Sequence, residues 1–376
     1  MKKSFWRNNA VQSLLASLIC IVLGLLIGFI VLLFINPAGA VEAITAVVKN
    51  FMNYSRANLQ LKNFGATLVK TAPLLMCALS VLFAYKVGLF NIGAAGQYTV
   101  GICASIYAAL AWHWSWIACM FFAMLVGAVW GTLPGLLKAY ANVNEVISGI
   151  MLNWIGLYST NMILTTVKES TSPYTFHIAT ENPSAILPTL GLEKFFAGNT
   201  KVTLAIPLSV LLAIVISVIL NRTRLGYELK ATGNNKNAAK YAGMAEKRNI
   251  ILTLAIAGAL AGLGAALFYL TDYEQWQCTA SSVPGMGFSG IAATFLGGLN
   301  PIGTIFSSYF IQHITSGGAF VDKSVYCSQI SDLISSIIIY LCGFVLFLKL
   351  SMNNIALRQE ERRSAAAAAA EKGGDK

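Results

Sequence analysis

Residues 221–249 read NRTRLGYELKATGNNKNAAKYAGMAEKRN and separate two long apolar runs, 202–220 and 250–270. The segment holds seven Lys and Arg residues but only two Glu. Lys and Arg next to membrane spans are retained on the cytoplasmic side, so this segment is expected to be a cytoplasmic loop. Within it, Ala238 and Ala239 followed by Gly243 predict a short helix closed by a glycine. A folded basic element at the inner face indicates a cytoplasmic partner.

The composition of the whole chain is that of an integral membrane protein. Its 376 residues are 56% hydrophobic and 11% charged, whereas soluble domains carry roughly 25% charged residues. The net charge of +11 is explained by basic cytoplasmic loops, and no basic soluble module is present that would bind a nucleic acid. The first apolar run, 11–35, exceeds the roughly 7–15 residues of a signal-peptide core, so we interpret it as a retained span.

About ten apolar stretches are expected to enter or cross the membrane, since a span needs about 20 apolar residues. They are 11–35, 65–85, 91–111, 115–137, 143–165, 202–220, 250–270, 285–299, 302–318 and 328–349. The piece 285–299 is short for a full crossing, and the GGLNP stretch at 297–301 then breaks the helix, because proline cannot continue it. Two tilted spans or a re-entrant loop both fit residues 285–318.

The predicted fold is an all-α polytopic transmembrane bundle with short or broken helices and with both termini in the cytoplasm. This orientation places most of the 26 Lys and Arg residues inside. Residues 1–350 form the membrane domain, and 351–376 form a cytoplasmic tail that is expected to be disordered. Glycines four residues apart, such as Gly127/Gly131 and Gly258/Gly262, predict close helix packing. Cys278 and Cys327 fall in outer loops, and the sequence leaves their pairing open.

Two polar clusters are candidates for a solute pathway. Asn91 and Gln97 lie at the mouth of a span among glycines, where polar groups are costly unless they pair or line a cavity. Each amide alone is explained by hydrogen bonding between helices, but the cluster indicates a path for a polar, uncharged solute. Asn144 and Glu145 are explained as a helix cap and a first-turn acid, and Asn153 lies about two turns further along the same face.

Catalytic and metal-binding motifs are scarce. Gly287-Phe288-Ser289-Gly290, with His313 further on, is similar to the nucleophile motif of rhomboid intramembrane proteases, which raises a Ser-His dyad as an alternative. A four-residue match is weak in a glycine-rich membrane protein. The sequence has no phosphate-binding loop and no Cys/His metal spacing, so no cofactor or metal is expected. Energy for pumping would therefore enter from a separate subunit.

Four blocks of sequence resemble ABC-importer permeases of the branched-chain amino acid/ribose class, in particular the nucleoside-importer subgroup. They are GLFNIGAAGQ at 88–97, NEVISGIMLNW at 144–154, the stretch 226–243 containing NAAKYAG, and FSGIA at 288–292 followed by Gly297. The chain departs from the family pattern at Ala95 and at Asn237, where the family generally has Glu.

The resemblance implies the partners and the site. A cytoplasmic ATP-binding subunit would dock on 225–244, a second permease would complete the path, and an extracellular substrate-binding lipoprotein would deliver the solute at a bacterial cytoplasmic membrane. The path would be lined by Asn91, Gln97, Asn144, Glu145 and Asn153, and the coupling residues would be Gly226, Glu228, Lys230, Asn237, Ala238, Ala239 and Gly243. Nucleosides are the expected solute. A simple sugar such as ribose, a secondary transporter and a rhomboid-type protease remain alternatives.

Overall fold

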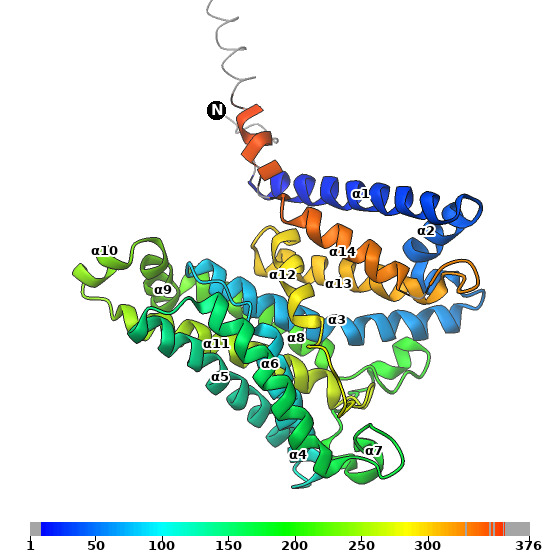
Figure 1. Ribbon diagram of the computed structural model, residues 1–376, viewed down its shortest axis with the longest axis horizontal. Helices are drawn as coiled ribbons and strands as arrows, with labels where there is room; N and C mark the ends of the chain where they lie inside the picture. The colour runs from blue at the N-terminus through cyan, green and yellow to red at the C-terminus, as the bar shows by residue number, and fades with distance from the viewer. Residues whose placement is uncertain (1–8, 328, 346, 349, 356, 358–376) are drawn as a thin grey trace, which may run out of the picture.

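The computed structural model describes residues 9–327, 329–345, 347–348, 350–355 and 357. These residues form a helical bundle (Figure 1) with two isolated β-bridges and no β-strand among them. The prediction of an all-α fold is therefore confirmed. Most of the predicted tail, residues 358–376, lies outside the described residues, as do Lys2, Lys3 and Arg7.

Helices of two lengths make up the bundle. The longer ones are α1 (Asn9–Ile35), α3 (Ala57–Lys86), α5 (Trp116–Ala141), α6 (Glu145–Leu164), α8 (Ala205–Arg222) and α11 (Glu246–Tyr269), and the shorter ones are α4 (Ala94–Leu110), α12 (Met286–Leu296), α13 (Pro301–Gly317) and α14 (Ile330–Cys342). Stretches within α1, α3, α5, α8 and α11 are each long and apolar enough to cross a membrane. The prediction of a polytopic membrane protein is confirmed.

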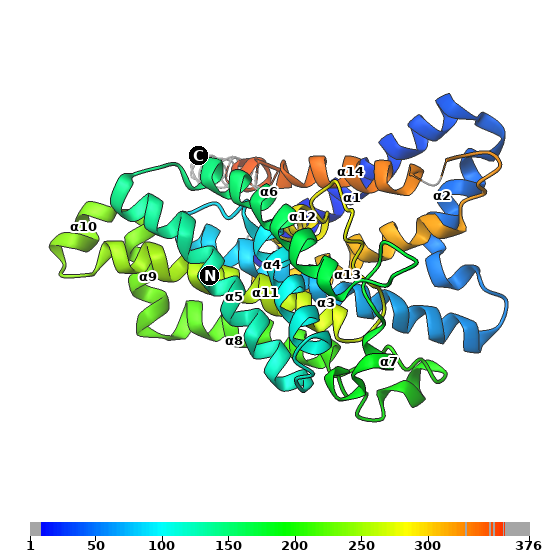
Figure 2. The same cartoon turned by 60° about the horizontal axis from the view of Figure 1, so that its bottom comes forward.

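Small helices occupy the connections. They are α2 (Ala40–Lys49), α7 (Ile178–Glu181), α9 (Arg224–Asn234) and α10 (Lys236–Tyr241), with 3-10 turns η2 (Pro37–Gly39), η3 (Asn50–Asn53), η4 (Thr165–Val167), η5 (Pro183–Ala185), η6 (Leu192–Phe196) and η7 (Gly318–Phe320). Figure 2 shows α9 and α10 at one end of the bundle and α2 and α7 toward the other. We call these the α9–α10 end and the loop end. Because successive membrane segments alternate in direction, α1 begins and α14 finishes at the α9–α10 end.

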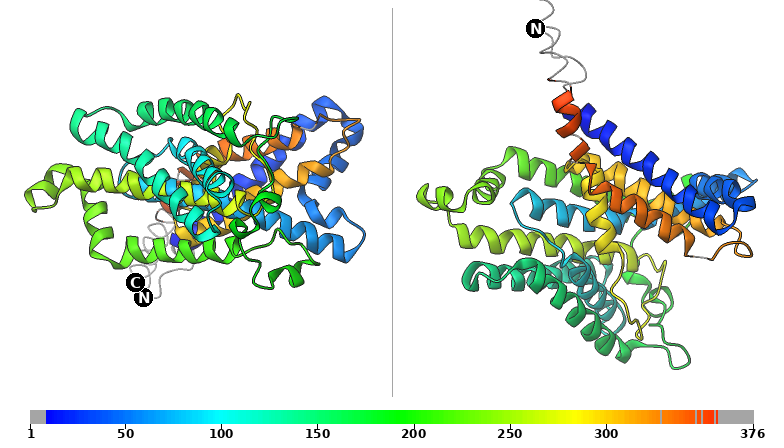
Figure 3. Two further views of the ribbon diagram at one scale, coloured as in Figure 1. Left: turned by 90° about the horizontal axis from the view of Figure 1, so that it is seen from below. Right: turned by 45° about the horizontal axis from the view of Figure 1, so that its top comes forward.

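Glycine stripes bring the central helices into backbone contact. On α5, Gly127 and Gly131 pack against Gly258 and Gly262 of α11, and a Cβ at any of the four would collide with backbone of the facing helix. This close approach is the arrangement predicted for small residues four apart. α3 and α11 are mostly buried, whereas α1 lies at the margin along α14, as Figure 3 shows.

The segment after α11 crosses the bundle in two parts. An irregular stretch descends from the loop end to Gly287, which contacts Ala95 of α4. The 11 residues of α12 then span about 16 Å at 1.5 Å per residue, and Phe295 reaches Tyr85 at the α9–α10 end. α13 begins at Pro301, capped by Asn300, and returns to the loop end. Residues 286–317 thus form two helices, α12 and α13, that run in opposite directions and meet at the break at 297–300.

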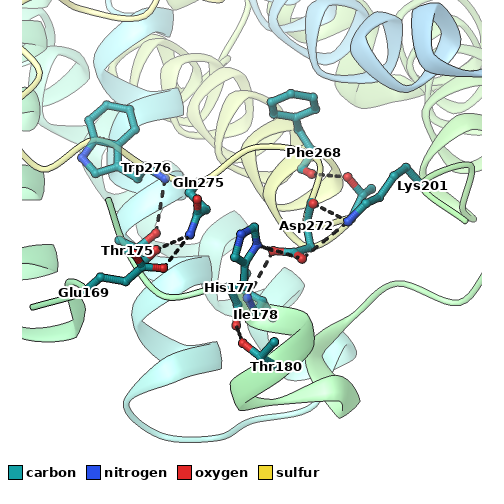
Figure 4. A network of polar contacts seen from close by, with 11 residues as sticks. Glu169, Thr175, His177, Ile178, Thr180, Lys201, Phe268, Asp272, Gln275 and Trp276 are labelled. Atoms are coloured by element: carbon teal, nitrogen blue, oxygen red, sulfur yellow. Dashed lines mark hydrogen bonds and ion pairs between the residues drawn. The ribbon is translucent and has the colours of Figure 1, made fainter. Parts of the chain in front are cut away.

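The loop end carries an ordered layer formed by residues 165–204. Asp272, at the end of α11, accepts hydrogen bonds from the Ile178 backbone N–H at 3.2 Å, from His177 Nδ1 at 3.3 Å and from Lys201 Nζ at 3.5 Å, as drawn in Figure 4. The Asp272 side chain is 7% exposed. A buried carboxylate needs such partners, so this network fastens the layer to the helix bundle.

The two cysteines for which the sequence left pairing open do not form a disulfide. Cys278 is buried and Cys327 is exposed, and both are free thiols. Burial raises the pKa of the Cys278 thiol above its ordinary value, which disfavours the thiolate that reacts. The structure therefore closes the question that the sequence left open: there is no disulfide between Cys278 and Cys327.

Candidate solute pathway and coupling element

Asn91 and Gln97 hydrogen-bond to each other at the start of α4. Asn91 Nδ2 donates to Gln97 Oε1 at 2.8 Å, and Gln97 Nε2 donates to Asn91 Oδ1 at 3.1 Å. Asn91 Nδ2 also donates to the Ser80 hydroxyl of α3 at 2.9 Å. Both amides are buried. The pair therefore joins the chain between α3 and α4 to the first turns of α4 by a closed set of hydrogen bonds.

Asn153 supplies the cap that α4 lacks locally. The first residue before α4, Gly93, has no side chain to bond the free N–H groups of the helix start, which need partners in a buried site. Asn153 Oδ1 accepts the Gly96 N–H at 2.7 Å, and Asn153 Nδ2 donates to the Ile92 carbonyl at 3.1 Å. α6 thus holds the start of α4 through one amide side chain.

Ala95, the position where the resemblance would place Glu, lies at the contact between α4 and α12. Ala95 is fully buried, and a Cβ at Gly287 of α12 would come within 2.7 Å of its Cβ. Gly96 packs equally closely on the Asn153 backbone. The close contact between α4 and α12 therefore depends on the missing side chain at Gly287, and it encloses Ala95 completely.

Asn144 and Glu145 lie apart from this cluster, at the α9–α10 end of α6. Asn144 caps α6 by accepting the Val146 N–H at 2.8 Å, as the capping interpretation predicts. Glu145 forms an ion pair with Lys138 of α5 at 2.9 Å. The structure therefore brings Asn91, Gln97 and Asn153 together around the start of α4. The other two predicted path residues lie at the N-terminus of α6, the helix that carries Asn153.

The protease alternative finds no support in the geometry around His313. His313 Nε2 lies 2.8 Å from the Val48 carbonyl, and its Nδ1 lies 3.3 Å from Asn50 Nδ2 and 3.4 Å from the Tyr309 hydroxyl. Both ring nitrogens thus face groups at the loop end, while Ser289 lies on α12. These contacts do not include a bond from His313 to Ser289.

The basic element between α8 and α11 is anchored by one face of α9. Thr223 caps α9 by accepting the Gly226 N–H at 3.1 Å, and a Cβ at Gly226 would collide with the last turn of α8. Leu229 is fully buried, and Asn249 of α11 donates to the Thr232 hydroxyl at 2.8 Å. Buried positions three residues apart make α9 a rigid extension of the bundle.

The opposite face of α9 carries an ion pair within the helix. Arg224 Nε lies 2.7 Å from Glu228 Oε1, one turn along the helix, and Lys230 is half-buried. Pairs of this kind contribute a few tenths of a kcal/mol to a helix. The ion pair therefore adds local stability to α9 but does not by itself define a site.

The tip of the element is the short helix α10, which confirms the sequence-based prediction. Asn235 caps it by accepting the Ala238 N–H at 3.0 Å. At its end Gly243 adopts a φ of +78°, its N–H bonds to the Lys240 carbonyl at 3.0 Å, and the Met244 N–H bonds to the Ala239 carbonyl at 3.0 Å. This is the Schellman closure that favours glycine. Of the predicted coupling residues in α10, Ala239 is buried while Asn237 and Ala238 are exposed, and Gly243 just after the helix is also exposed.

Sequence reasoning missed two aromatic residues of this element. Tyr241 is 93% exposed at the tip of α10, and Tyr227 is 65% exposed on α9. Exposed tyrosines are typical anchors of protein interfaces. The sequence signal for Tyr241 was its position after Lys, Asn and Ala residues at 236–240. A tyrosine in so polar a segment is expected to be exposed.

Potential metal ligands are scattered among the described residues. No group of three or more His, Cys, Asp or Glu residues with metal-binding geometry occurs in the part of the chain that the structure covers. The bundle thus combines a polar, glycine-packed helix junction with a rigid element that protrudes at one end, an arrangement expected of a membrane permease.

Comparison with known proteins identifies the family. Residues 63–343 match the model of the branched-chain amino acid transport system permease component, so the chain belongs to this family of multi-pass membrane permeases and is not an enzyme. The guanosine ABC transporter permease protein NupP of Bacillus subtilis is 31% identical over 331 residues, 87% of this chain and 92% of the relative.

Two further relatives extend the comparison. The nucleoside ABC transporter permease protein NupB of Lactococcus lactis is 30% identical over 348 residues, covering 89% of this chain and 91% of its own length. A second guanosine ABC transporter permease protein of Bacillus subtilis, NupQ, is 27% identical over 255 residues, covering 65% of this chain and 78% of its own length. No solved structure matches the chain.

Proposed function

We propose that this chain is a permease subunit of a bacterial ABC importer for nucleosides. The observation that carries the proposal is the similarity, over almost the whole chain, to permeases named for guanosine and nucleoside transport. The polar cluster of Asn91, Gln97 and Asn153 agrees with an uncharged, hydrogen-bonding solute, because amides are neutral donors and acceptors.

The α9–α10 end is proposed to face the cytoplasm and to bind the ATP-hydrolysing subunit through α10. The packing of α9 supports this proposal. Gly226 of α9 packs against α8, and Thr232 of α9 bonds to Asn249 of α11. A displacement of the exposed α10 would therefore be transmitted to both membrane helices. Its seven Lys and Arg residues also favour the inner face of the membrane.

A second permease and an external binding protein complete the proposed assembly. Bacillus subtilis has two similar guanosine permeases, NupP and NupQ, which favours a pair of different chains over two copies of one chain. We propose that a substrate-binding lipoprotein binds to the layer of residues 165–204 at the loop end of the bundle.

The path is proposed to involve Asn91, Gln97, Asn144, Glu145 and Asn153. Asn144 and Glu145 lie at the entrance of α6, and the three other side chains are buried between α3, α4 and α6. A solute would meet the buried three only when the start of α4 moves away from α6. Asn153, which bonds two backbone groups of that start, is the proposed hinge contact.

A secondary transporter is less well supported than an ATP-driven importer. Proton or sodium coupling generally uses a carboxylate within the membrane. Among the side chains whose burial the structure describes, Asp272 is the buried acid, and it lies at the loop end bonded to Lys201 and His177.

The experiment that tests the function is uptake by a reconstituted transporter. The permease is assembled in liposomes with its ATP-binding subunit, its partner permease and its binding protein, and uptake of labelled guanosine, uridine and ribose is compared with and without ATP. ATP-dependent uptake of the nucleosides supports the proposal. Uptake of ribose alone would replace it with a sugar importer, and uptake without the ATP-binding subunit would overturn the ABC mechanism.

A further inference from the structure

The backbone of α9 touches the backbone that connects α3 to α4. Gly233 lies in the last turn of α9, and a Cβ on it would collide with the carbonyl of Val87, the C-cap of α3. From the other side, a Cβ on Gly88 would come within 2.9 Å of the Gly233 carbonyl oxygen. Because both residues are glycine, the two backbones meet with no side chain between them.

Gly88 closes the end of α3 in a conformation that glycine adopts readily. Its φ is +76°, its N–H bonds to the Tyr85 carbonyl at 3.0 Å, and the Leu89 N–H bonds to the Ala84 carbonyl at 3.0 Å. This pair of hydrogen bonds is the Schellman closure of a helix. The end of α3 is therefore a rigid corner, and α9 packs directly against that corner.

The chain between this corner and α4 is packed at both ends. Leu89 is buried in an apolar cluster that also contains Ile250 and Leu254 of α11. Gly93, directly before α4, lies against Gly149 of α6, where a Cβ on Gly149 would come within 3.0 Å of the Gly93 nitrogen. A displacement of the corner therefore cannot be absorbed by a loose loop before it reaches α4.

Hydrogen bonds join the middle of the same connection to the polar cluster. Asn91 and Gln97 exchange two hydrogen bonds, and the Ile92 carbonyl accepts one from Asn153 Nδ2 at 3.1 Å. Closely packed protein interiors have low compressibility and transmit displacement. Residues 88–93 thus form a continuous mechanical link from α9 to the amides that hold the start of α4.

We propose that the contact between Gly88 and Gly233 is the joint through which the ATP-binding subunit moves the start of α4. Both glycines are positioning residues, since they act on Asn91 and Asn153 through the connection and do not themselves contact solute. Movement of α10 with the docked subunit displaces α9, and the joint passes this displacement to the polar cluster. The inference rests on the proposed function, because it takes an ATP-binding subunit as the source of the movement.

Gly233→Ala tests the joint from the side of α9. The added methyl group collides with the Val87 carbonyl, so α9 has to move away from α3, although alanine favours the helix itself. We expect the number of guanosine molecules imported per ATP hydrolysed to fall about tenfold, in the range typical of coupling between two sites. Co-purification with the ATP-binding subunit should stay parental, because α10 is unchanged.

Gly88→Asn tests the same joint from the side of α3. Asparagine tolerates a positive φ, so the corner keeps its conformation while its Cβ meets the Gly233 carbonyl, and the same loss of coupling is expected. Gly285→Ala is the matched control, since it adds a methyl group at the start of α12 where no atom lies within 4 Å. It should transport like the parent. Parental coupling in both joint variants would overturn the proposal.

Hydrogen–deuterium exchange of the assembled transporter follows the movement in the parent itself. Peptides covering 236–241 report docking at α10, and peptides covering 88–97 report the connection and the start of α4. When a non-hydrolysable ATP analogue is added, we expect exchange in 88–97 to change in the parent and to stay constant in Gly233→Ala. Protection of 236–241 by the docked subunit should be equal in both. A merely local packing role of Gly233 would leave the nucleotide response of 88–97 in place.

The outcomes separate the joint from the importer. If nucleotide leaves exchange in 88–97 of the parent unchanged while guanosine is still imported, the joint is refuted and the proposed function stands. Loss of protection at 236–241 in Gly233→Ala would assign this glycine to docking and would also refute the joint. Absence of ATP-dependent nucleoside uptake by the parent would overturn the proposed function, and the joint with it.

Discussion

Asn153 of α6 and Gly96 of α4 are joined by a hydrogen bond of 2.7 Å across 57 residues of sequence. The Asn153 side chain takes the place of a local N-cap for α4. The two helices can approach this closely because residue 96 is glycine: a Cβ there would lie 2.7 Å from the Asn153 Cα. The start of α4 is therefore held by α6 and not by its own sequence. Any motion that opens a path between these helices has to break this contact.

Asn153→Ala is expected to loosen the start of α4. It leaves the Gly96 N–H and the Ile92 carbonyl without partners, and a buried unpaired group costs about 1–3 kcal/mol. We expect a lower melting temperature in detergent and altered uptake rate or solute preference. Asn63→Ala, which loses a bond within α3 at an exposed position, is the control. Equal behaviour of the two variants would remove the special role of Asn153.

Gly243→Val should uncouple the transporter while leaving the membrane domain folded. A β-branched residue is strained at the φ of +78° that Gly243 adopts, so the closure of α10 is lost. Gly198→Val imposes the same strain at the loop end, where φ is +75° and space is also open. We expect co-purification with the ATP-binding subunit to fail for Gly243→Val alone. If both variants retain the subunit, α10 is not the docking element.

Gly131→Leu should prevent normal packing of α5 against α11. A Cβ at this position already meets the Leu254 carbonyl, and overpacking of a filled site costs about 1–3 kcal/mol or more. The expected result is a large loss of monodisperse protein in size-exclusion chromatography. Leu125→Ala, on the exposed face of the same helix, should behave like the parent. Normal recovery of Gly131→Leu would contradict the packing account.

Asp272→Asn and Asp272→Ala separate charge from backbone conformation at the loop end. Asp272 has a φ of +53°, which Asn tolerates and Ala resists. Asp272→Asn removes the attraction to the partly exposed Lys201, worth about 1 kcal/mol or less. Asp272→Ala adds the backbone cost and leaves Ile178 N–H unpaired. Limited proteolysis of residues 165–204 should therefore be faster for Ala than for Asn, and the reverse order would refute this account.

Local patterns in the sequence determined where the membrane segments lie and how the basic element is built. Apolar runs of span length located the helices, because a span must pair its own backbone and cover itself with apolar side chains. The GGLNP stretch at 297–301 marked the break between α12 and α13, and Gly243 marked the end of α10. Both could be predicted because glycine and proline end helices through their own backbone conformation. The glycine stripes predicted close packing for the same reason.

Tertiary structure alone decided the contacts between distant segments. That Asn91 and Gln97 bond to each other, that Asn153 caps α4, and that Gly287 meets Ala95 depends on how α4 lies against its neighbours. These contacts could not be predicted from the sequence, since a polar side chain in a span has the same local signature whether it pairs or faces a path. The contact between Gly88 and Gly233 also followed only from packing, because it joins two segments that lie far apart in the sequence.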